Sequence, residues 1–229
     1  MNANLRSTSA VLGFPRIGPQ REVKKALEAY WGDKISAEEL LKVAKEQRLN
    51  TYATIKEQGV DFVPTGTFSL YDHVLDMSNT LGIIPEAYAK SGLSQLDTYF
   101  AMARGHQKGG VDLPATEMKK WFDSNYHYLV PEFSEKSEFK LNDNKPVDDF
   151  IEAKEAGYNA RPVILGPLTL LWLGKTSKDA QDPNFNRYSL LPKLAQTYVQ
   201  LFEKLAAAGA PWVQLDEPIL VVDTAKQLS

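Results

Sequence analysis

Three times along the chain, a segment with helical periodicity ends on a glycine and is followed closely by a short apolar run. The three glycines are Gly59, Gly157 and Gly209, and the apolar runs that follow them cover residues 60–64, 161–166 and 212–216. Glycine commonly ends a helix because it adopts the left-handed conformation without a steric penalty. Alternating helices and short apolar strands are typical of β/α units, which form a parallel sheet covered by helices.

Five strand candidates are present, near Leu12, Phe62, Tyr128, Ile164 and Val213. A closed parallel barrel needs eight strands, and 229 residues hold eight β/α units only if each unit is about 30 residues long. The spacing here is wider, so the pattern predicts an α/β fold that is either an open parallel sheet or an incomplete TIM-type barrel, with about five of its eight units. We assign residues 1–10 to a disordered lead-in and residues 11–229 to this domain.

Local patterns predict where the helices lie. An amphipathic helix is expected over residues 20–30, and a second one over 37–58 should begin with a capping box of Ser36 and Glu39. Further helices are expected over residues 70–81, 96–104, 116–122 and 190–208. Residues 125–130 are expected to be a strand, 163–173 a buried strand with a turn, and 105–114, 133–145 and 176–186 mainly loops.

The composition argues against several classes of protein. A net charge of −3 disfavours nucleic acid as a partner. No apolar run approaches the roughly 20 residues of a membrane-spanning helix, and the polar N-terminus lacks the apolar segment of a signal peptide. We therefore expect no membrane partner and a cytoplasmic location. The chain has no cysteine, and His73, His106 and His127 are far apart in sequence, so we expect no metal site in this chain.

A basic cluster surrounds the start of the first helix. Arg16, Arg21, Lys24 and Lys25 lie where the free N–H groups and the dipole of a helix favour anions. The cluster is therefore a candidate site for a phosphate or a carboxylate. The alternative is a solvated basic face, which is common on surface helices.

Two adjacent carboxylates, Asp216 and Glu217, follow the apolar run that begins at Trp212. In β/α folds the carboxyl ends of strands carry functional groups. Consecutive side chains of a strand point to opposite faces, so these two carboxylates should not both enter one pocket. Either one of them binds a ligand, or they belong to a structural turn with a buried salt bridge.

A dense aromatic segment, residues 117–128, also contains amide and basic side chains. This mixture suits a planar ligand with an anionic tail, and the alternative is a packed aromatic corner. For His127 we favour a structural role. The chain has no Walker A motif, no dinucleotide-binding glycine fingerprint and no nucleophile elbow, so those classes of enzyme lack support.

Four separated segments, taken together, resemble the N-terminal part of the cobalamin-independent methionine synthases. They are LGFPRIG with REVKK in residues 12–25, KWFDSNYHY in 120–128, PVILGP in 162–167 and VQLDEP in 213–218. The segments occur in the same order as in that family. The resemblance implies a methyltransferase that moves a methyl group from 5-methyltetrahydropteroyltri-L-glutamate to L-homocysteine in methionine biosynthesis.

The resemblance also implies what this chain lacks. Members of the family have two (β/α)8 barrels, and the C-terminal barrel holds Zn2+ and homocysteine through His, Cys and Glu side chains. This chain would be about five-eighths of the N-terminal barrel, with the C-terminal barrel as its partner. It would bind no cofactor, contain no catalytic residue and be inactive alone.

In that family the N-terminal barrel helps to bind the polyglutamate tail of the folate. The matching positions are Gln20, Arg21, Glu22, Val23, Lys24, Lys120 and Asn125, with Arg16, Asp216 and Glu217 as secondary candidates. Cationic side chains at a helix N-terminus suit a tail of several carboxylates. The resemblance thus favours an anion site at the basic cluster and a structural role for Asp216 and Glu217.

Two other functions stay open. A stand-alone folate-binding or interaction module would use the same binding residues without catalysis. A different barrel enzyme, such as a decarboxylase of the uroporphyrinogen type or a glycosidase using Asp216 or Glu217, fits less well. Adjacent carboxylates on opposite faces of a strand do not flank a sugar in the way that glycoside hydrolysis needs.

Overall fold

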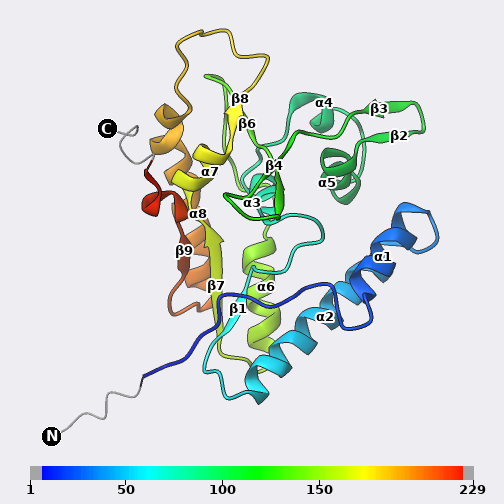
Figure 1. Cartoon of the computed structure of the whole chain (residues 1–229), viewed down its shortest axis with the longest axis vertical. Helices are drawn as coiled ribbons and strands as arrows, with labels where there is room; N and C mark the ends of the chain where they lie inside the picture. The colour runs from blue at the N-terminus through cyan, green and yellow to red at the C-terminus, as the bar shows by residue number, and fades with distance from the viewer. Residues whose placement is uncertain (1–6, 224–229) are drawn as a thin grey trace, which may run out of the picture. The chain divides into compact units, whose positions relative to one another are not determined.

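The computed structural model describes residues 7–223 as a mixed α/β protein with several small sheets (Figure 1). The chain divides into two compact units. Unit 1 comprises the chain up to residue 70 with residues 146–163 and 205–214, and unit 2 comprises residues 71–145, 164–204 and the chain from residue 215. The expected lead-in of residues 1–10 lies mostly outside the described residues, but Ser9 donates from its backbone N–H to Asp61 Oδ2 at 2.8 Å.

Unit 1 begins with the two expected helices, α1 (Glu22–Trp31) and α2 (Ala37–Glu57). The capping box of α2 is present, because Glu39 N–H donates to Ser36 Oγ at 3.2 Å and Ser36 N–H donates to Glu39 Oε2 at 2.7 Å. These two bonds satisfy backbone donors that a helix start leaves unpaired. The sequence therefore fixes the start of α2 locally.

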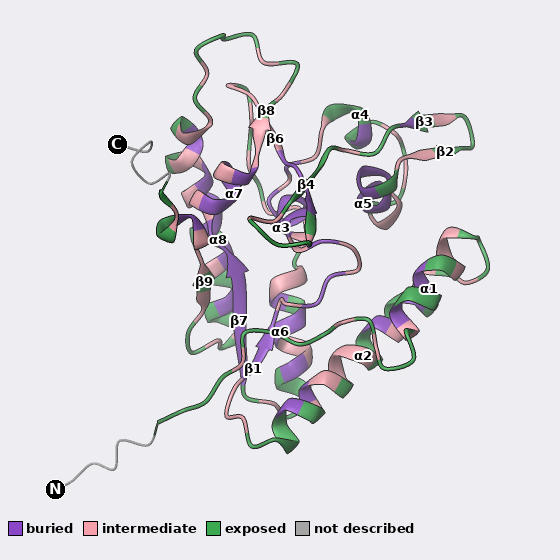
Figure 2. Cartoon of the chain, viewed as in Figure 1, coloured by how far each residue is buried: buried purple, intermediate pink, exposed green. Residues whose placement is uncertain are grey.

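The parallel sheet has the order β1 (Val63–Thr65), β7 (Ala160–Leu165), β9 (Gln214–Asp216). Val63 pairs with Ala160 and Thr65 with Pro162 in parallel register, and Ala10 forms an isolated parallel bridge with Phe62 on the other side of β1. All six residues of β7 are buried, as Figure 2 shows along the whole strand. A strand buried on both faces is typically rich in apolar residues, and here Arg161 is the one charged residue among the six.

Helix α6 (Lys145–Glu155) precedes β7, and its residues from 146 onward belong to unit 1. Arg48 of α2 binds this helix, because its Nε and Nη2 donate to the two Glu152 carboxylate oxygens at 2.7 and 2.8 Å. Asp149 lies 3.7 Å from the same Nε and is 5% exposed. This forked, partly buried pair fixes the position of α2 against α6.

Unit 2 contains most of the remaining elements. Its helices are α3 (His73–Thr80), α4 (Glu86–Ala89), α5 (Gln95–Arg104), α7 (Pro167–Leu173), the 3-10 turns Arg187–Leu190 and Pro218–Val221, and α8 (Leu191–Ala208), whose last residues from 205 belong to unit 1. Its two-stranded sheets pair β2 (His106–Lys108) with β3 (Val111–Leu113), β4 (Met118–Lys120) with β5 (His127–Leu129), and β6 (Glu132–Phe133) with β8 (Lys175–Thr176).

The predicted helices over residues 70–81, 96–104 and 190–208 are confirmed within a few residues. Three other expectations were wrong. Residues 105–114, expected as a loop, form the antiparallel hairpin β2–β3, and residues 116–122, expected as a short helix, contain strand β4. The turn expected after the buried strand in residues 163–173 is helix α7. The β2–β3 hairpin turns at Gly109 and Gly110, both with positive φ, which is a local hairpin signal in the sequence. Strand β4 depends on its hydrogen bonds to β5, which the pattern of residues 116–122 does not indicate.

The five expected strands do not all join one sheet. Those near Phe62, Ile164 and Val213 are β1, β7 and β9, while the candidate near Leu12 makes only the bridge at Ala10. The candidate near Tyr128 is a strand, but it pairs antiparallel with β4 in a separate hairpin. The parallel sheet of residues 7–223 therefore has three strands and a bridge, and a barrel of five units is not seen in it.

One glycine of unit 1 has no room for a side chain. Gly66, directly after β1, has a φ of +82°, and a Cβ there would lie 2.6 Å from the Val163 carbonyl oxygen of β7. Gly59 has a similar φ of +78° but nothing within 4 Å of the same position. The two glycines separate the cost of the backbone conformation from the cost of the steric clash.

We expect Gly59→Ala to lower the free energy of unfolding by about 1–2 kcal/mol, the usual cost of the left-handed conformation. Gly66→Ala should cost at least about 1 kcal/mol more, because β1 and β7 must also move apart. Urea unfolding followed by circular dichroism measures both values. Equal losses in the two variants would contradict the close approach of Gly66 to β7.

Candidate functional site

The first group of candidate residues lies at the start of α1 in unit 1. The helix begins at Glu22, two residues later than expected, because Arg21 adopts the left-handed conformation with a φ of +60°. Arg21 N–H donates to the Gly18 carbonyl at 3.0 Å, which closes a tight turn before the helix. Gln20, Arg21 and Lys24 are exposed to solvent, so this helix start presents two cationic side chains and an amide.

Glu22 and Val23 have other surroundings. Glu22 Oε2 accepts a hydrogen bond from Gln20 N–H at 3.0 Å, and a Cβ on Gly18 would lie 2.1 Å from the same oxygen. The carboxylate therefore folds back over the turn. Val23 is 1% exposed and packs into unit 1. Of the five expected positions, Gln20, Arg21 and Lys24 have exposed side chains, Glu22 is half-buried and Val23 is buried.

A cavity of about 600 Å³ lies beside this helix start. Its walls are the loop from Phe14 to Pro19, the Glu22 side chain and one side of α2 from Gln47 to Glu57. Arg16, a secondary candidate, lines this cavity. The volume falls within the range of small-molecule pockets, and the wall combines apolar loop residues with amide and hydroxyl groups of α2.

The second group of candidates lies on the β4–β5 hairpin of unit 2. Lys120 ends β4 and pairs with His127, and Asn125 lies in the turn between the strands. All three are exposed. The turn is closed by Trp121 N–H, which donates to the Tyr126 carbonyl at 2.7 Å, and by Ser124 N–H, which donates to the Trp121 carbonyl at 3.1 Å. The hairpin thus offers a cation and an amide from one short turn.

A buried carboxylate, Asp72, lies beneath this hairpin. It is 1% exposed, and its Oδ2 accepts from the N–H groups of Leu75, in α3, and Leu129, in β5, each at 3.0 Å. Tyr126 Oη donates to Asp72 Oδ1 at 3.1 Å, and His73 Nδ1 lies 3.6 Å from that oxygen. Burial raises the pKa of Asp72, and the adjacent His73 and the N–H donors counteract this rise.

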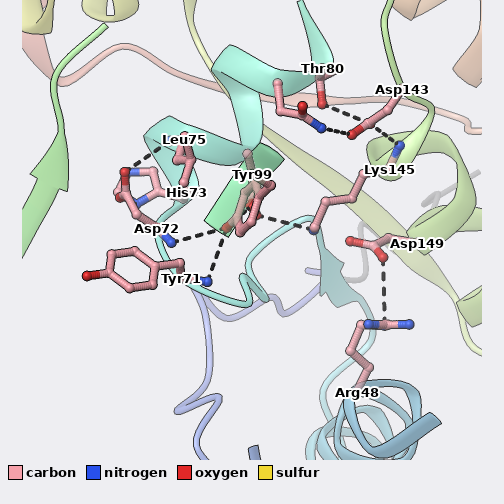
Figure 3. Close-up of polar contacts among 12 residues, drawn as sticks. Arg48, Tyr71, Asp72, His73, Leu75, Thr80, Tyr99, Asp143, Lys145 and Asp149 are labelled. Carbon is pink, nitrogen blue, oxygen red and sulfur yellow. Dashed lines mark hydrogen bonds and ion pairs between the residues drawn. The ribbon is translucent and has the colours of Figure 1, made fainter. Parts of the chain in front are cut away.

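A second group of hydrogen bonds, centred on the Tyr99 hydroxyl, begins at the backbone of Asp72, as Figure 3 shows. Tyr99 Oη accepts from the N–H groups of Tyr71 at 3.1 Å and Asp72 at 3.4 Å and donates to Asp76 Oδ1 at 2.7 Å. Lys145 Nζ lies 3.5 Å from Asp76 Oδ2. Burial is the main cause that raises the pKa of Tyr99, so its hydroxyl keeps its proton and can donate to Asp76.

Asp72, His73 and Tyr99 are not among the site residues that the sequence predicts. Aspartate followed by a helical pattern is an N-cap signal, and that signal was available for Asp72. Its bonds to Leu129 and Tyr126 join residues more than 50 positions apart, so no local pattern indicates them. His127, expected to be structural, is exposed, with Nδ1 3.1 Å from the Asn125 carbonyl oxygen.

Glu217, a secondary candidate for which the resemblance favoured a structural role, makes three hydrogen bonds to the first turn of α7. Its Oε1 accepts from Leu168 N–H at 2.9 Å, and its Oε2 accepts from Thr169 N–H at 2.7 Å and Thr169 Oγ1 at 2.5 Å. The carboxylate therefore caps the first turn of α7, and it also lies where a Cβ on Gly166 would clash with it. The Asp216 carbonyl accepts from Gly166 N–H at 2.8 Å. Both Glu217 carboxylate oxygens thus accept hydrogen bonds from α7, which does not suit a role in sugar hydrolysis.

The candidates are distributed over both units: Arg16 and residues 20–24 lie in unit 1, and Lys120, Asn125, Asp216 and Glu217 lie in unit 2. Between residues 7 and 223, the His, Asp and Glu side chains form no group of three or more that would suit a metal ion. Over the same residues, every helix is too short or too polar to cross a membrane.

Comparison with known proteins identifies the chain over almost its whole length. Residues 8–229 match the family model described as cobalamin-independent synthase, N-terminal domain. A probable 5-methyltetrahydropteroyltriglutamate–homocysteine methyltransferase of Schizosaccharomyces pombe is 54% identical over 226 residues, or 96% of this chain. The methyltransferase of the same name from Saccharomyces cerevisiae is 53% identical over 94% of this chain, and that of Chelativorans sp. is 50% identical over 95%.

The chain spans only 29% of the length of each of these three relatives. The matched part corresponds to the N-terminal domain named by the family model.

Glu217→Gln should destabilise the chain by about 1–3 kcal/mol, because the amide of glutamine would place a donor against the N–H groups of α7. Urea unfolding measures the loss. Glu203→Gln, an exposed position on α8, is the matched control and should change stability by less than about 0.5 kcal/mol. Equal stabilities of the two variants would show that the cap of α7 carries no net energy.

Proposed function

The chain belongs to the family of cobalamin-independent synthase N-terminal domains, and from this membership we propose that it is the N-terminal part of a methionine synthase. The full enzyme would transfer a methyl group from 5-methyltetrahydropteroyltri-L-glutamate to L-homocysteine, as the names of the relatives state for them. In this proposal the present chain binds the polyglutamate tail of the folate. The observation that carries the proposal is the exposed pair Arg21 and Lys24 at the start of α1.

The helix start suits a tail of carboxylates for two physical reasons. The first N–H groups of a helix have no partner within the helix, and the helix dipole favours negative charge at this end. Arg21 and Lys24 add charge-assisted hydrogen bonds. Lys24 lies 3.6 Å from Glu28, but this exposed pair is weak enough for a ligand carboxylate to compete.

Glu22 contributes differently in this proposal. Its carboxylate lies over the turn at Gly18 and accepts from Gln20 N–H, so it orders the loop in front of the helix. The buried side chain of Val23 anchors the same turn from the inner side. Glu22 and Val23 would therefore shape the site, while Gln20, Arg21 and Lys24 would contact the ligand. Lys120 and Asn125 on the hairpin would supply a further cation and amide.

The residues of this chain do not fit the zinc site expected in the full enzyme. The chain has no cysteine, and its described histidines and carboxylates do not gather into a ligand set. We place zinc and homocysteine on the C-terminal barrel, which would be the partner of this domain. This arrangement agrees with the share of the relatives' length that the chain spans.

The proposed architecture is part of a (β/α)8-type barrel over residues 11–229, in a cytoplasmic protein. The parallel order of Ala10, β1, β7 and β9 follows the order of the chain, as neighbouring strands of such a barrel do. A stand-alone folate-binding module would share the tail site, and only the catalytic outcome would differ.

We expect Arg21→Ala, Lys24→Ala and Lys120→Ala each to weaken binding of 5-methyltetrahydropteroyltriglutamate about fivefold, since each removes a cation worth roughly 1 kcal/mol to a carboxylate. Isothermal titration of the 229-residue chain measures the dissociation constants. Lys42→Ala removes an exposed cation from α2 and should leave the affinity unchanged. Equal effects of all four variants would reduce the site to general charge attraction.

We also expect no methionine when the purified chain is mixed with homocysteine, Zn2+ and the methylated folate, because the expected zinc ligands lie outside it. Mass spectrometry of the reaction mixture tests this. The reference reaction uses a full-length relative at the same concentration. Methionine formation by the chain alone would contradict the proposal that zinc and homocysteine bind to the C-terminal barrel.

A further inference from the structure

We infer that Asp72 is a positioning residue for the hairpin-borne part of the folate-tail site. The inference rests on the proposed function, because it concerns how Lys120 and Asn125 are presented to the tail. Asp72 touches neither of these side chains through any bond described above. It acts through the backbone of β5 and through Tyr126, which immediately follows Asn125.

The number of bonds to Asp72 exceeds what a helix cap needs. An N-cap side chain has to accept one hydrogen bond from the first turn of its helix, and serine, threonine or asparagine does this as well as aspartate. Leu75 N–H supplies that bond here at 3.0 Å. The remaining acceptor capacity of the carboxylate goes to the hairpin, through Leu129 N–H at 3.0 Å and Tyr126 Oη at 3.1 Å.

Burying a carboxylate is costly unless its oxygens are well paired. Asp72 is 1% exposed, so a neutral cap would avoid this cost at the same position. A carboxylate is needed only where several donors from different elements converge on one side chain. The three donors come from α3, from β5 and from the turn of the hairpin, which makes Asp72 the point where the hairpin is attached to the helix.

Ring contacts of His73 also hold the hairpin against α3. The His73 ring is stacked against Tyr126, with centroids 5.6 Å apart, and meets Trp121 edge-on at 4.5 Å. Trp121 directly follows Lys120, and Tyr126 directly follows Asn125. Both residues of the proposed tail site therefore have a neighbour in sequence that is held against the first residue of α3.

The bonds within the turn transmit this position. Trp121 N–H donates to the Tyr126 carbonyl at 2.7 Å, and Tyr126 N–H donates to Ser124 Oγ at 3.2 Å. With both ends of the turn fixed, the distance between the Lys120 and Asn125 backbones is fixed as well. Loss of the Tyr126 hydroxyl should release one end of the turn without creating a cavity.

The test is a coupling measurement by titration of the 229-residue chain with 5-methyltetrahydropteroyltriglutamate. Tyr126→Phe should weaken binding about fivefold, the equivalent of one typical hydrogen bond of about 1 kcal/mol. The same substitution should weaken binding less than about twofold when Lys120 and Asn125 are already alanine, because their position then no longer matters. In an Arg21→Ala background the fivefold effect should persist, because Arg21 lies on α1 in unit 1 and not on the hairpin.

Tyr198→Phe is the matched control. It also removes a buried hydroxyl in unit 2, one that donates to the Leu165 carbonyl at 2.7 Å, far in sequence from the hairpin. It should cost similar stability in urea unfolding and leave the affinity unchanged. Asp72→Asn should weaken binding more than Tyr126→Phe, and if it fails to fold, the Tyr126 series decides alone.

Two failures are distinguishable. If the unmodified chain does not bind the triglutamate, the proposed function fails and this inference falls with it. If the unmodified chain binds, but Tyr126→Phe has no effect or the same effect in every background, Asp72 is only a structural residue and the inference alone is overturned.

Discussion

The buried strand β7 is the constraint on which the parallel sheet depends. All six of its residues are removed from solvent, so its backbone N–H and C=O groups must find partners on both sides. β1 supplies them on one side and β9 on the other. The close approach of Gly66 to Val163 follows from the same demand, because the chain leaves β1 directly over the backbone of β7.

Buried or partly buried carboxylates hold the remaining elements in place. Glu217 caps α7 from the residue after β9, Asp72 joins α3 to the β4–β5 hairpin, and Glu152 binds the guanidinium of Arg48. Each carboxylate accepts at least two hydrogen bonds, which offsets the cost of removing its charge from water. The function of these anions is to connect segments that are distant in sequence.

Of the two groups of candidate residues, the one on the β4–β5 hairpin lies on an element that Asp72 anchors. Exposed cations at the start of α1 and on the hairpin face solvent, while the residues beside them, Val23 and Tyr128, are buried. Because a buried residue lies next to each exposed cation, the backbone that carries the flexible cationic side chain is held in place. A polyanionic tail is recognised at low entropic cost when its partners are held in this way.

The sequence by itself determined the long helices α1, α2, α5 and α8, the buried strand of residues 161–166, the capping box at Ser36 and the family, because these depend on local periodicity or on motifs in order. It also indicated the basic side chains at the start of the first helix. Only the tertiary structure decided that residues 118–129 form a hairpin and that Asp72 accepts hydrogen bonds from it. The physical reason is that β4 is fixed by its pairing with β5 and that the bonds of Asp72 join residues more than 50 positions apart, and such contacts leave no periodic trace in the sequence around either partner.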